Sequence, residues 1–377
     1  MSLLTDRALQ FLRSPRAPRA RPPARRLPWM AGAAAVAGIG IGFATAQSAE
    51  MPVILHHQTL GLAPAAQIHS QAIDGNTIVL GAPMDASLGD ETGAVYVFER
   101  PPGGSWVQTA WLQLANAQRC QRFGARVDLS GNTLVASHWN QATFCTPTPL
   151  YGLHAFERSN GLWTPTLSRD HAADQGLFLA FDGSNLVNSR VDGAFALRRN
   201  SSGSWASGSS PLAGIPDPYT DLGSLGMSVD VREGLAALGE AYLVPGTDRM
   251  LPAAVLWQRS TNGSWQRLTD VRVAPTAQRP GKPWPDRTTV ALGPEGRLAI
   301  NEFVFERNAA GQYVETASLR PPCTADADVT VQFDEHGDLA LVHTGPYDRP
   351  RVYNTDYLPL TDTGKLHLYR RVAPGQW

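Results

Sequence analysis

Two stretches rich in acidic residues are the parts of this chain that most resemble a metal site. Asp85, Asp90 and Glu91 fall within one short segment, and Asp326 stands two residues before Asp328. A calcium-binding loop needs several oxygen ligands at alternating positions and a glycine at its bend. Neither stretch has that spacing, so we expect solvated acidic turns and predict no metal and no cofactor.

No local motif marks a catalytic centre. His56 and His57 are adjacent, and adjacent residues on a strand point to opposite faces, so the two cannot bind one ion together. The sequence has no Gly-x-Ser-x-Gly, His-Glu-x-x-His or Gly-x-x-x-x-Gly-Lys-Ser/Thr motif. Carboxylates contributed by separate repeats of one fold would leave no such motif, so an enzyme stays open as an alternative.

A six-fold repeat organises the chain that must position these residues. In each copy an apolar run stops at an arginine, a turn rich in Gly, Ser, Asn or Pro follows, and an aromatic residue comes five or six positions after the arginine. This is the pattern of a β-hairpin. Because the aromatic residue recurs at a fixed place, we expect it to pack against the neighbouring repeat rather than to stack on sugars. The pairs are Arg100 and Trp106, Arg158 and Trp163, Arg199 and Trp205, Arg259 and Trp265, Arg307 and Tyr313, and Arg371 and Trp377.

A second hairpin precedes each of these signatures. Gly75-Asn76 and Gly131-Asn132 separate alternating, β-branched runs, and such residues supply the positive φ angles of a two-residue hairpin loop. Each repeat therefore has four strands, which is one blade of a β-propeller. We predict an all-β propeller of six blades, with seven as the alternative. The same turn in later copies is Asp182-Gly183, Glu233-Gly234, Glu295-Gly296 and His336-Gly337.

The two ends of the repeat array are complementary. Val53 to Leu60 reads as a strand with no hairpin partner before it, and the last repeat stops at Trp377, where earlier repeats continue into a strand such as Val107 to Leu114. An unpaired strand edge is a liability that closure of the ring removes. We expect the N-terminal strand to pair with the third strand of the sixth blade and to close the propeller.

Two stretches carry a resemblance to a known family. Phe123 to Val135, which reads Phe-Gly-Ala-Arg-Val-Asp-Leu-Ser-Gly-Asn-Thr-Leu-Val, and Gly81-Ala82-Pro83, leading on to Gly93 through Arg100, resemble the FG-GAP repeats of bacterial secreted proteins. Those repeats are similar to the blades of the integrin α-subunit propeller, which has seven. The match fades in later repeats, where Leu225-Gly226 replaces Phe-Gly. The resemblance implies a propeller over residues 51–377.

The first 46 residues predict an export signal. Residues 1–28 are rich in Arg and Pro, and Leu27 to Ala46 is an uncharged run that ends in Ala44-Thr45-Ala46, small residues of the kind a signal peptidase reads. The many glycines and alanines of the run disfavour a stable membrane span. We expect cleavage before Gln47, a propeller domain over residues 47–377, and a periplasmic or secreted protein. Sec and twin-arginine export both stay open.

Charge argues against nucleic acid as a partner. After residue 46 the chain has 25 basic and 32 acidic residues, a net charge of −7. A mildly acidic protein is a poor ligand for nucleic acid or for an anionic membrane surface.

The three cysteines allow one disulfide and leave one cysteine over. Cys120 lies in the connection entering the second blade and Cys145 in the long loop of that blade, so a propeller places both on one face. We predict a Cys120–Cys145 bridge, in keeping with an exported chain, with Cys323 unpaired. Closing a loop of this size contributes about 3 kcal/mol of stability.

Long loops between the second and third strands define the predicted binding face. They are Ala82 to Thr92, His138 to Leu150, Glu240 to Leu251 and Thr344 to Thr361, and all open on one face of a propeller. We predict a non-enzymatic propeller that binds a protein or glycan through this face; the alternative is a hydrolase or lyase with carboxylates in the central channel. The aromatic residues expected to make the contacts are Trp139, Phe144, Tyr242, Tyr347 and Tyr353.

Overall fold

The computed structural model confirms an all-β chain built from short antiparallel strands. It describes residues 60, 67–140, 150–171, 175–190, 193–206, 210–214, 228–247, 250–275, 288–319, 328–334, 337, 339–344, 365–373 and 376–377. Within these residues the strands form six sheets, five with four strands and the last with three, and each sheet keeps its strands in chain order. We number them blades 1 to 6.

The strand bounds follow the predicted repeats. The first three blades are β1 (Ser70–Asp74), β2 (Thr77–Ala82), β3 (Ala94–Glu99) and β4 (Val107–Leu112); β5 (Arg126–Ser130), β6 (Thr133–Asn140), β7 (Leu150–Ser159) and β8 (Leu162–His171); and β9 (Gln175–Phe181), β10 (Asn185–Arg190), β11 (Gly193–Arg198) and β12 (Ser210–Ala213).

The remaining blades have the same order. They are β13 (Ser228–Arg232), β14 (Leu235–Leu243), β15 (Met250–Arg259) and β16 (Trp265–Arg272); β17 (Val290–Leu292), β18 (Leu298–Ile300), β19 (Phe303–Arg307) and β20 (Tyr313–Ser318), with the short 3-10 helix η2 (Pro294–Gly296) in the first turn; and β21 (Asp328–Phe333), β22 (Leu339–Thr344) and β23 (Lys365–Tyr369).

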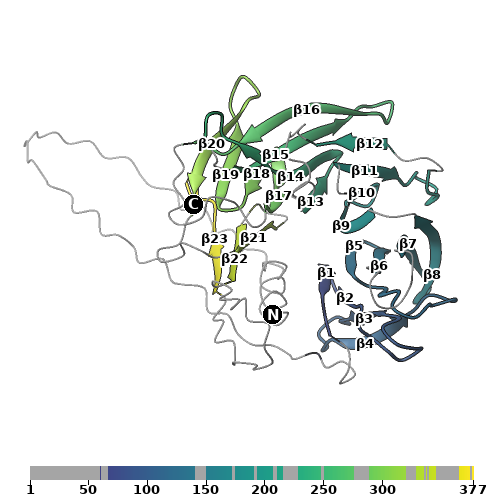
Figure 1. The fold of residues 1–377 in the computed structure, drawn as a ribbon. Helices are drawn as coiled ribbons and strands as arrows, with labels where there is room; N and C mark the ends of the chain where they lie inside the picture. Colours follow the sequence, from purple (N-terminus) through teal and green to yellow (C-terminus); the bar gives the residue numbers. More distant parts are fainter. Residues whose placement is uncertain are drawn as a thin grey trace, which may run out of the picture.

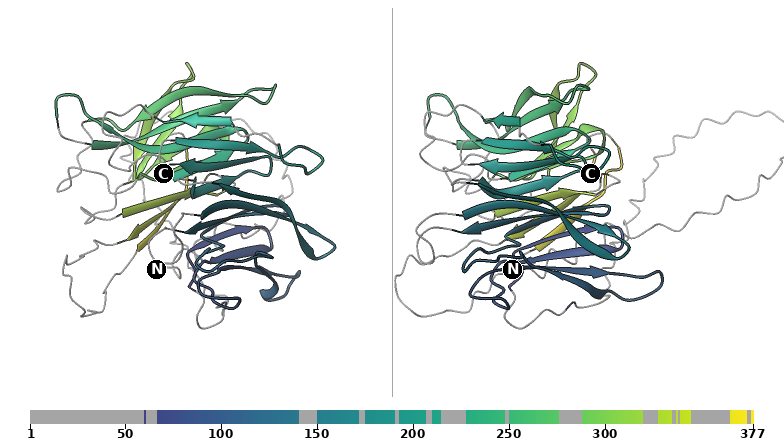
Figure 2. Two further views of the ribbon diagram at one scale, coloured as in Figure 1. Left: turned by 45° about the vertical axis from the view of Figure 1, so that its right-hand side comes forward. Right: turned by 90° about the vertical axis from the view of Figure 1, so that its right-hand side faces the viewer.

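The six sheets follow one another around an arc, as a propeller requires. Figure 1 shows blade 1 in purple at one end of the arc and blade 6 in yellow-green at the other, and Figure 2 shows the same sheets from the side. The first strands of successive blades, β1, β5, β9, β13, β17 and β21, contact one another in that order. The predicted β-propeller is therefore confirmed.

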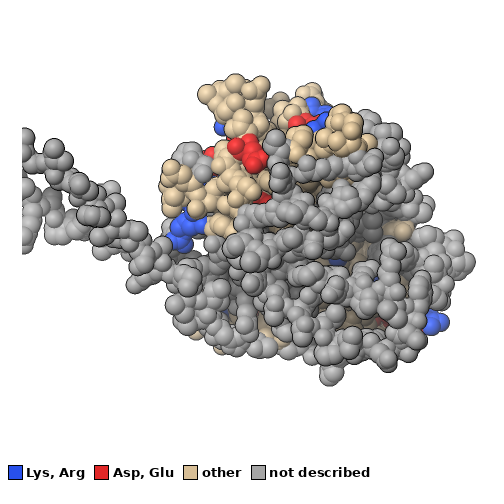
Figure 3. Space-filling model, turned by 60° about the vertical axis from the view of Figure 1, so that its left-hand side comes forward, with Lys and Arg blue, Asp and Glu red and all other residues tan. Residues whose placement is uncertain are grey.

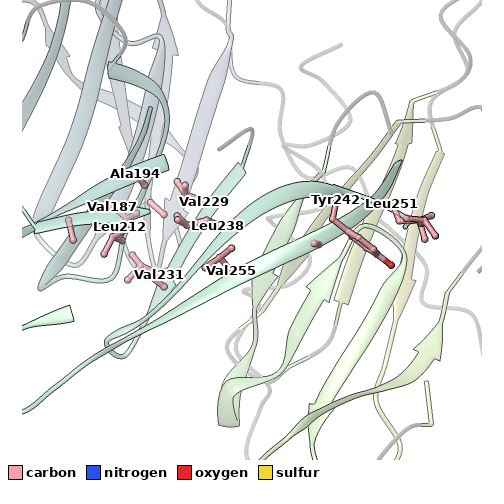
Figure 4. Packing of buried hydrophobic residues seen from close by; sticks show 14 residues of the cluster. Val187, Ala194, Leu212, Val229, Val231, Leu238, Tyr242, Leu251 and Val255 are labelled. Atoms are coloured by element: carbon pink, nitrogen blue, oxygen red, sulfur yellow. The ribbon is translucent and has the colours of Figure 1, made fainter. Parts of the chain in front are cut away.

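The hydrophobic core lies between neighbouring blades. Separate clusters join blades 1 and 2, 2 and 3, 3 and 4, 4 and 5, and 5 and 6. Between blades 3 and 4, Val187 and Leu212 meet Val229, Leu238 and Val255 (Figure 4). No sheet buries both of its faces alone, so each blade depends on its neighbours for stability.

The recurring aromatic residues have the predicted structural role. Arg158 pairs across its hairpin with Trp163, Arg259 with Trp265, and Arg307 with Tyr313. The aromatic residues of all six repeats pack against the apolar clusters. The signature is thus a packing device of the blade.

Four of the signature hairpins contain a β-bulge that the sequence pattern did not reveal. The register shifts by one residue between the third and fourth strands of blades 1, 2, 4 and 5, always next to the apolar residue that opens the signature. The extra residue in blade 2 is Thr166 and in blade 1 Thr109. A bulge twists the outer strand and redirects the extra side chain.

The glutamate-arginine pair of the signature links neighbouring blades. The arginine of one blade bonds the glutamate of the preceding blade, 42 to 65 residues earlier, and each pair is at least half-buried. In blade 3 Arg198 replaces the glutamate, and Arg259 of blade 4 donates instead to Asn185 Oδ1 at 2.8 Å. The ion pairs are Arg158 with Glu99 at 2.6 Å, Arg199 with Glu157 at 2.5 Å, and Arg371 with Glu306 at 2.8 Å.

Several predictions for the ends of the chain lie outside the described residues. These include the signal segment 1–46, the closing strand up to residue 59, and Cys145 and Cys323. Leu60 and Ile68 pack against the face of blade 1 that no other described blade covers. Ring closure by the N-terminal strand therefore stays a prediction. Cys120 is disulfide-bonded, and the identity of its partner as Cys145 stays a prediction.

Candidate functional site

The loop-bearing face differs from its prediction at the second and fourth blades. His138 to Asn140 belong to β6, and Glu240 to Leu243 and Met250 to Leu251 belong to β14 and β15, so both loops are shorter than predicted. In blade 4 the register continues to the pair Leu243 and Met250. The boundaries were wrong because apolar residues continue the strand pattern past the expected turn.

Tyr242 is a core residue, and its prediction as a surface contact is wrong. Its side chain is buried, its hydroxyl donates to the carbonyl of Val273 at 2.6 Å, and the guanidinium of Arg272 lies 5.0 Å from its ring centre. The backbone of Trp139 lies in β6, opposite Tyr151. The Trp139 side chain, Phe144, Tyr347 and Tyr353 lie outside the part of the chain that the structure describes.

The first long loop is joined to the connection that enters blade 2. Residues 90–93 run parallel to residues 120–123 and bond to them through the backbone. Cys120 N–H donates to the carbonyl of Asp90 at 2.8 Å, Arg122 to Glu91 at 2.9 Å and Phe123 to Thr92 at 3.0 Å. We call residues 85–93 and 119–124 together the stitched platform. Backbone hydrogen bonds join its two segments as in a parallel sheet, although the segments lie outside the strands of the blades.

Asp85 stabilises this platform through hydrogen bonds. It is buried, accepts the N–H of Ser87 at 2.9 Å and the hydroxyl of Tyr96 at 2.5 Å, and its own carbonyl accepts the N–H of Gly93. Burial by itself raises the pKa of Asp85, but the hydrogen bonds from Ser87 and Tyr96 outweigh it and lower the pKa. Burial and the carboxylate together raise the pKa of Tyr96. Asp85 is therefore a buried acceptor, which corrects the prediction of a solvated turn.

The other acids of the loop pair with arginines rather than gathering around one point. Asp90 lies 2.8 Å from Arg119, and Glu91 lies 2.6 Å from Arg122. The disulfide-bonded Cys120 stands between the two arginines. Among the described residues no group of three His, Cys, Asp or Glu side chains could hold a metal ion.

The Phe-Gly segment, which forms the end of the platform, meets the Gly-Ala-Pro segment of blade 1. Phe123 is fully buried, and Gly124 has a φ of +86° that disfavours any side chain. A Cβ on Gly81 would overlap the carbonyl oxygen of Gly124, and a Cβ on Gly124 would lie 2.5 Å from that of Ala94. Two glycines are needed because the backbones of blades 1 and 2 touch at this point.

The platform carries an apolar side chain that is exposed to solvent. Leu88 is 58% exposed and stands two residues before Asp90, which forms the exposed ion pair with Arg119. An exposed leucine surrounded by polar groups has the composition of a small interface centre with a polar rim. Sequence reasoning missed Leu88 because a single leucine in a loop gives no periodic signal.

Acidic residues recur along the strands next to the central channel, but each is used by the fold. The carboxylates accept backbone N–H groups from the following blade: Asp74 from Gly131, Asp128 from Phe181, Asp182 from Gly234, and Asp230 from Leu292, at 2.6, 2.7, 3.2 and 2.7 Å. Burial raises the pKa of Asp230 to about 6, although the N–H groups of Leu292 and Val231 oppose the rise. These acids link blades.

A buried histidine pair lies inside blade 2. His138 Nδ1 and His154 Nε2 are 2.8 Å apart, the rings stack with centres 5.1 Å apart, and the hydroxyl of Ser168 lies 3.3 Å from His154 Nδ1. Burial, with a smaller contribution from His138, lowers the pKa of His154 to about 3. His154 is therefore neutral at physiological pH.

Two pockets open on the opposite face, which carries the short hairpin turns. One, of about 430 Å³, lies at the channel mouth between Asp74, Asp182 and Arg232. The other, of about 550 Å³, lies at the rim between blades 2 and 3, and we call it the rim pocket. Sequence reasoning missed both. The Ser- and Gly-rich stretch from Asn200 to Ser210, which weakens the outer strand of blade 3, was the available signal.

The described surface mixes charges of both signs. On the side shown in Figure 3, acidic and basic side chains lie close to one another. Among the described residues, no helix has the length and apolar character needed to span a bilayer.

Comparison with known proteins finds distant likenesses among solved structures. No known protein family matches the sequence, and no curated protein matches it. Similar solved structures of β-propellers include Hsv2 from Kluyvelomyces marxianus, with 10% identity over 74% of this chain and 73% of that one at a TM-score of 0.43. The GH43 endo-arabinanase from Bacillus licheniformis shows 13% identity over 67% and 93%, at a TM-score of 0.32. The extracellular domain of a one component system from B. thetaiotaomicron shows 13% identity over 75% and 32%, at 0.38.

Proposed function

We propose that this chain is an exported, non-enzymatic β-propeller that binds a protein or glycan through its loop-bearing face. The observation that carries the proposal is the stitched platform. Its parallel backbone bonds, its two ion pairs and the disulfide at Cys120 hold residues 86–92, none of which belongs to the apolar clusters of blades 1 and 2. Holding a loop rigid before binding lowers the entropy lost on association.

The chemistry of the platform favours a protein as the partner. Leu88 supplies an exposed apolar contact, and the charges of Asp90 and Arg119 neutralise each other at its edge. The non-enzymatic part of the proposal is supported by the channel acids, since Asp74, Asp128, Asp182 and Asp230 are engaged by backbone N–H groups.

Export is supported by the signal-like N-terminus and by the disulfide at Cys120, because disulfides persist in oxidising compartments. Kinship with FG-GAP repeats is supported by the contact between Gly81 and Gly124. Export and kinship with FG-GAP repeats are both parts of the proposal.

Site-specific photocrosslinking tests the binding face. A photoreactive residue at position 88 should crosslink to one discrete partner in periplasmic or culture extract, and the same residue at Val107, which is 50% exposed on β4, should not. Leu88→Asp should abolish the capture without changing the melting temperature. Equal crosslinking from both positions would contradict recognition by this face.

An activity screen tests the non-enzymatic part. Glycosides, esters and phosphoesters should give no turnover with the purified protein. Turnover that disappears in Asp230→Asn, with the fold retained, would favour a channel enzyme instead.

A further inference from the structure

The rim pocket lies where the signature hairpin of blade 3 departs from the repeat. In blades 1, 2, 4 and 5 the fourth strand begins within a residue of the signature aromatic. In blade 3 Trp205 forms an isolated bridge with Arg199, and β12 covers Ser210–Ala213. The pocket of about 550 Å³ lies between Ser202 to Trp205 of blade 3 and Thr166 to Arg169 on β8, the fourth strand of blade 2.

The volume and lining of the rim pocket fit a small polar ligand. Its size lies within the range of about 300–1,000 Å³ typical of small-molecule sites. Trp205 lines the pocket, and its indole N–H points to the hydroxyl of Thr166 at 3.4 Å. The hydroxyls of Ser202 and Ser204 lie across from Thr166 on the blade 3 turn, and Thr166 is the bulge residue of β8. An indole beside several hydroxyl groups is suited to the mixed apolar and polar surface of a sugar ring.

The charges around the pocket favour an acidic ligand. Glu157 forms an ion pair with Arg199 at 2.5 Å, so these two charges cancel. Arg169 also lines the pocket and is only partly buried; its guanidinium donates to the carbonyl of Ala206, which does not neutralise its charge. A guanidinium binds carboxylates with paired N–H groups.

The corresponding aromatic residue of blade 1 is more deeply buried. Trp106 is only 4% exposed, whereas Trp205 is partly exposed and reaches a hydroxyl of the neighbouring blade. Thr109 occupies the bulge position of Thr166. Trp205 therefore differs from its counterpart in blade 1 because part of its side chain is accessible at the surface.

We infer that the rim pocket binds a carboxylate-bearing saccharide, with Arg169 contacting the carboxylate and Trp205, Thr166 and Ser204 contacting the sugar. The site lies on the turn-bearing face. It is independent of the stitched platform and of the function proposed for it.

Calorimetric titration of the full chain with trigalacturonate tests this inference. Its neutral counterpart, trigalactose of the same linkage, and galacturonate alone are the comparison ligands. Trigalacturonate should bind at least tenfold more tightly than the neutral sugar. Arg169→Gln should remove that preference, because a charge-assisted contact is lost. Thr166→Val with Ser204→Ala should weaken both sugars severalfold.

Matched variants keep the result interpretable. Thr109→Val, at the same bulge position in blade 1, and Arg267→Gln, an exposed arginine on β16, should leave binding unchanged. Leu88→Asp should also leave it unchanged, which separates this site from the binding face proposed above. No binding of trigalacturonate up to about 10 mM, equal binding of the neutral sugar, or binding that survives both Arg169→Gln and the Thr166/Ser204 double variant would overturn the inference.

Discussion

The two faces of the propeller are held together by different kinds of contact. On the turn-bearing face, the same glutamate-arginine pair and the same aspartate-to-backbone bond recur from blade to blade. On the loop-bearing face, the stitched platform between blades 1 and 2 has contacts that no other described blade repeats. Contacts that recur with the blade period serve the architecture, and contacts that break the period are the better candidates for function. The rim pocket follows the same rule, because it lies where the repeat of blade 3 is broken.

The largest expected difference between the faces concerns two glycines. Gly124→Ala should destabilise the protein by about 3 kcal/mol or more, since a side chain at positive φ would also collide with the backbone of blade 1. Gly131→Ala is the control in a turn where nothing lies within 4 Å, and it should cost about 1 kcal/mol. Urea unfolding measures both. Equal losses would show that the loop-bearing contact is no tighter than an ordinary turn.

Acid should weaken the histidine pair near the loop-bearing end of blade 2. The folded-state pKa of His154 is about 3, below the ordinary 6.5, so the unfolded chain binds the proton first and stability is lost as pH falls below 6.5. His154 alone should contribute a loss of about 2 kcal/mol at pH 5 relative to pH 7 or above, and the net loss should be smaller because Asp230 acts in the opposite direction. Thermal melting at the two pH values measures it.

His154→Gln is the control for that pH effect, and the loss between pH 7 and pH 5 should disappear in it. Asp230 acts in the opposite sense. Its raised pKa of about 6 makes the folded state take up a proton first, so its contribution to stability falls as pH rises from about 4 to 6. An unchanged acid loss in His154→Gln would assign the effect to another group.

The smallest expected difference is between two ion pairs. Arg158 and Glu99 are 33% and 16% exposed and link two blades, whereas Arg119 and Asp90 are 67% and 59% exposed on the platform. A double-mutant cycle should give a coupling energy of about 1 kcal/mol for the first pair and under about 0.5 kcal/mol for the second, because water screens exposed charges. A larger coupling on the platform would show that its ion pairs stabilise the blades as well.

The fold could be predicted from local information. Gly75 and Gly131 mark hairpin turns in the sequence. Their φ values of 55° and 56° confirm that these turns need the positive φ angles that glycine adopts easily. The role of the aromatic residues followed from their fixed spacing, and Trp106, buried to 4% exposure, confirms it. Tyr242 was misplaced because apolar residues beyond a strand and apolar residues in a loop look alike in the sequence. Only the pairing of β14 with β15 separates them.

The sequence by itself therefore determined the blade, because strand alternation, turn glycines and hairpin spacing are properties of neighbouring residues. Only the tertiary structure decided which charges meet. Arg158 reaches Glu99 across 59 residues, Arg122 reaches Glu91 across 31, and Asp85 becomes buried because Tyr96 covers it. Which arginine pairs with which acid depends on how the blades stack. The sequence contains many arginines and acids that could form such pairs, so it does not select among them. Trp205 and Thr166 come together for the same reason, since they lie 39 residues apart in the sequence and on neighbouring blades that both line the rim pocket.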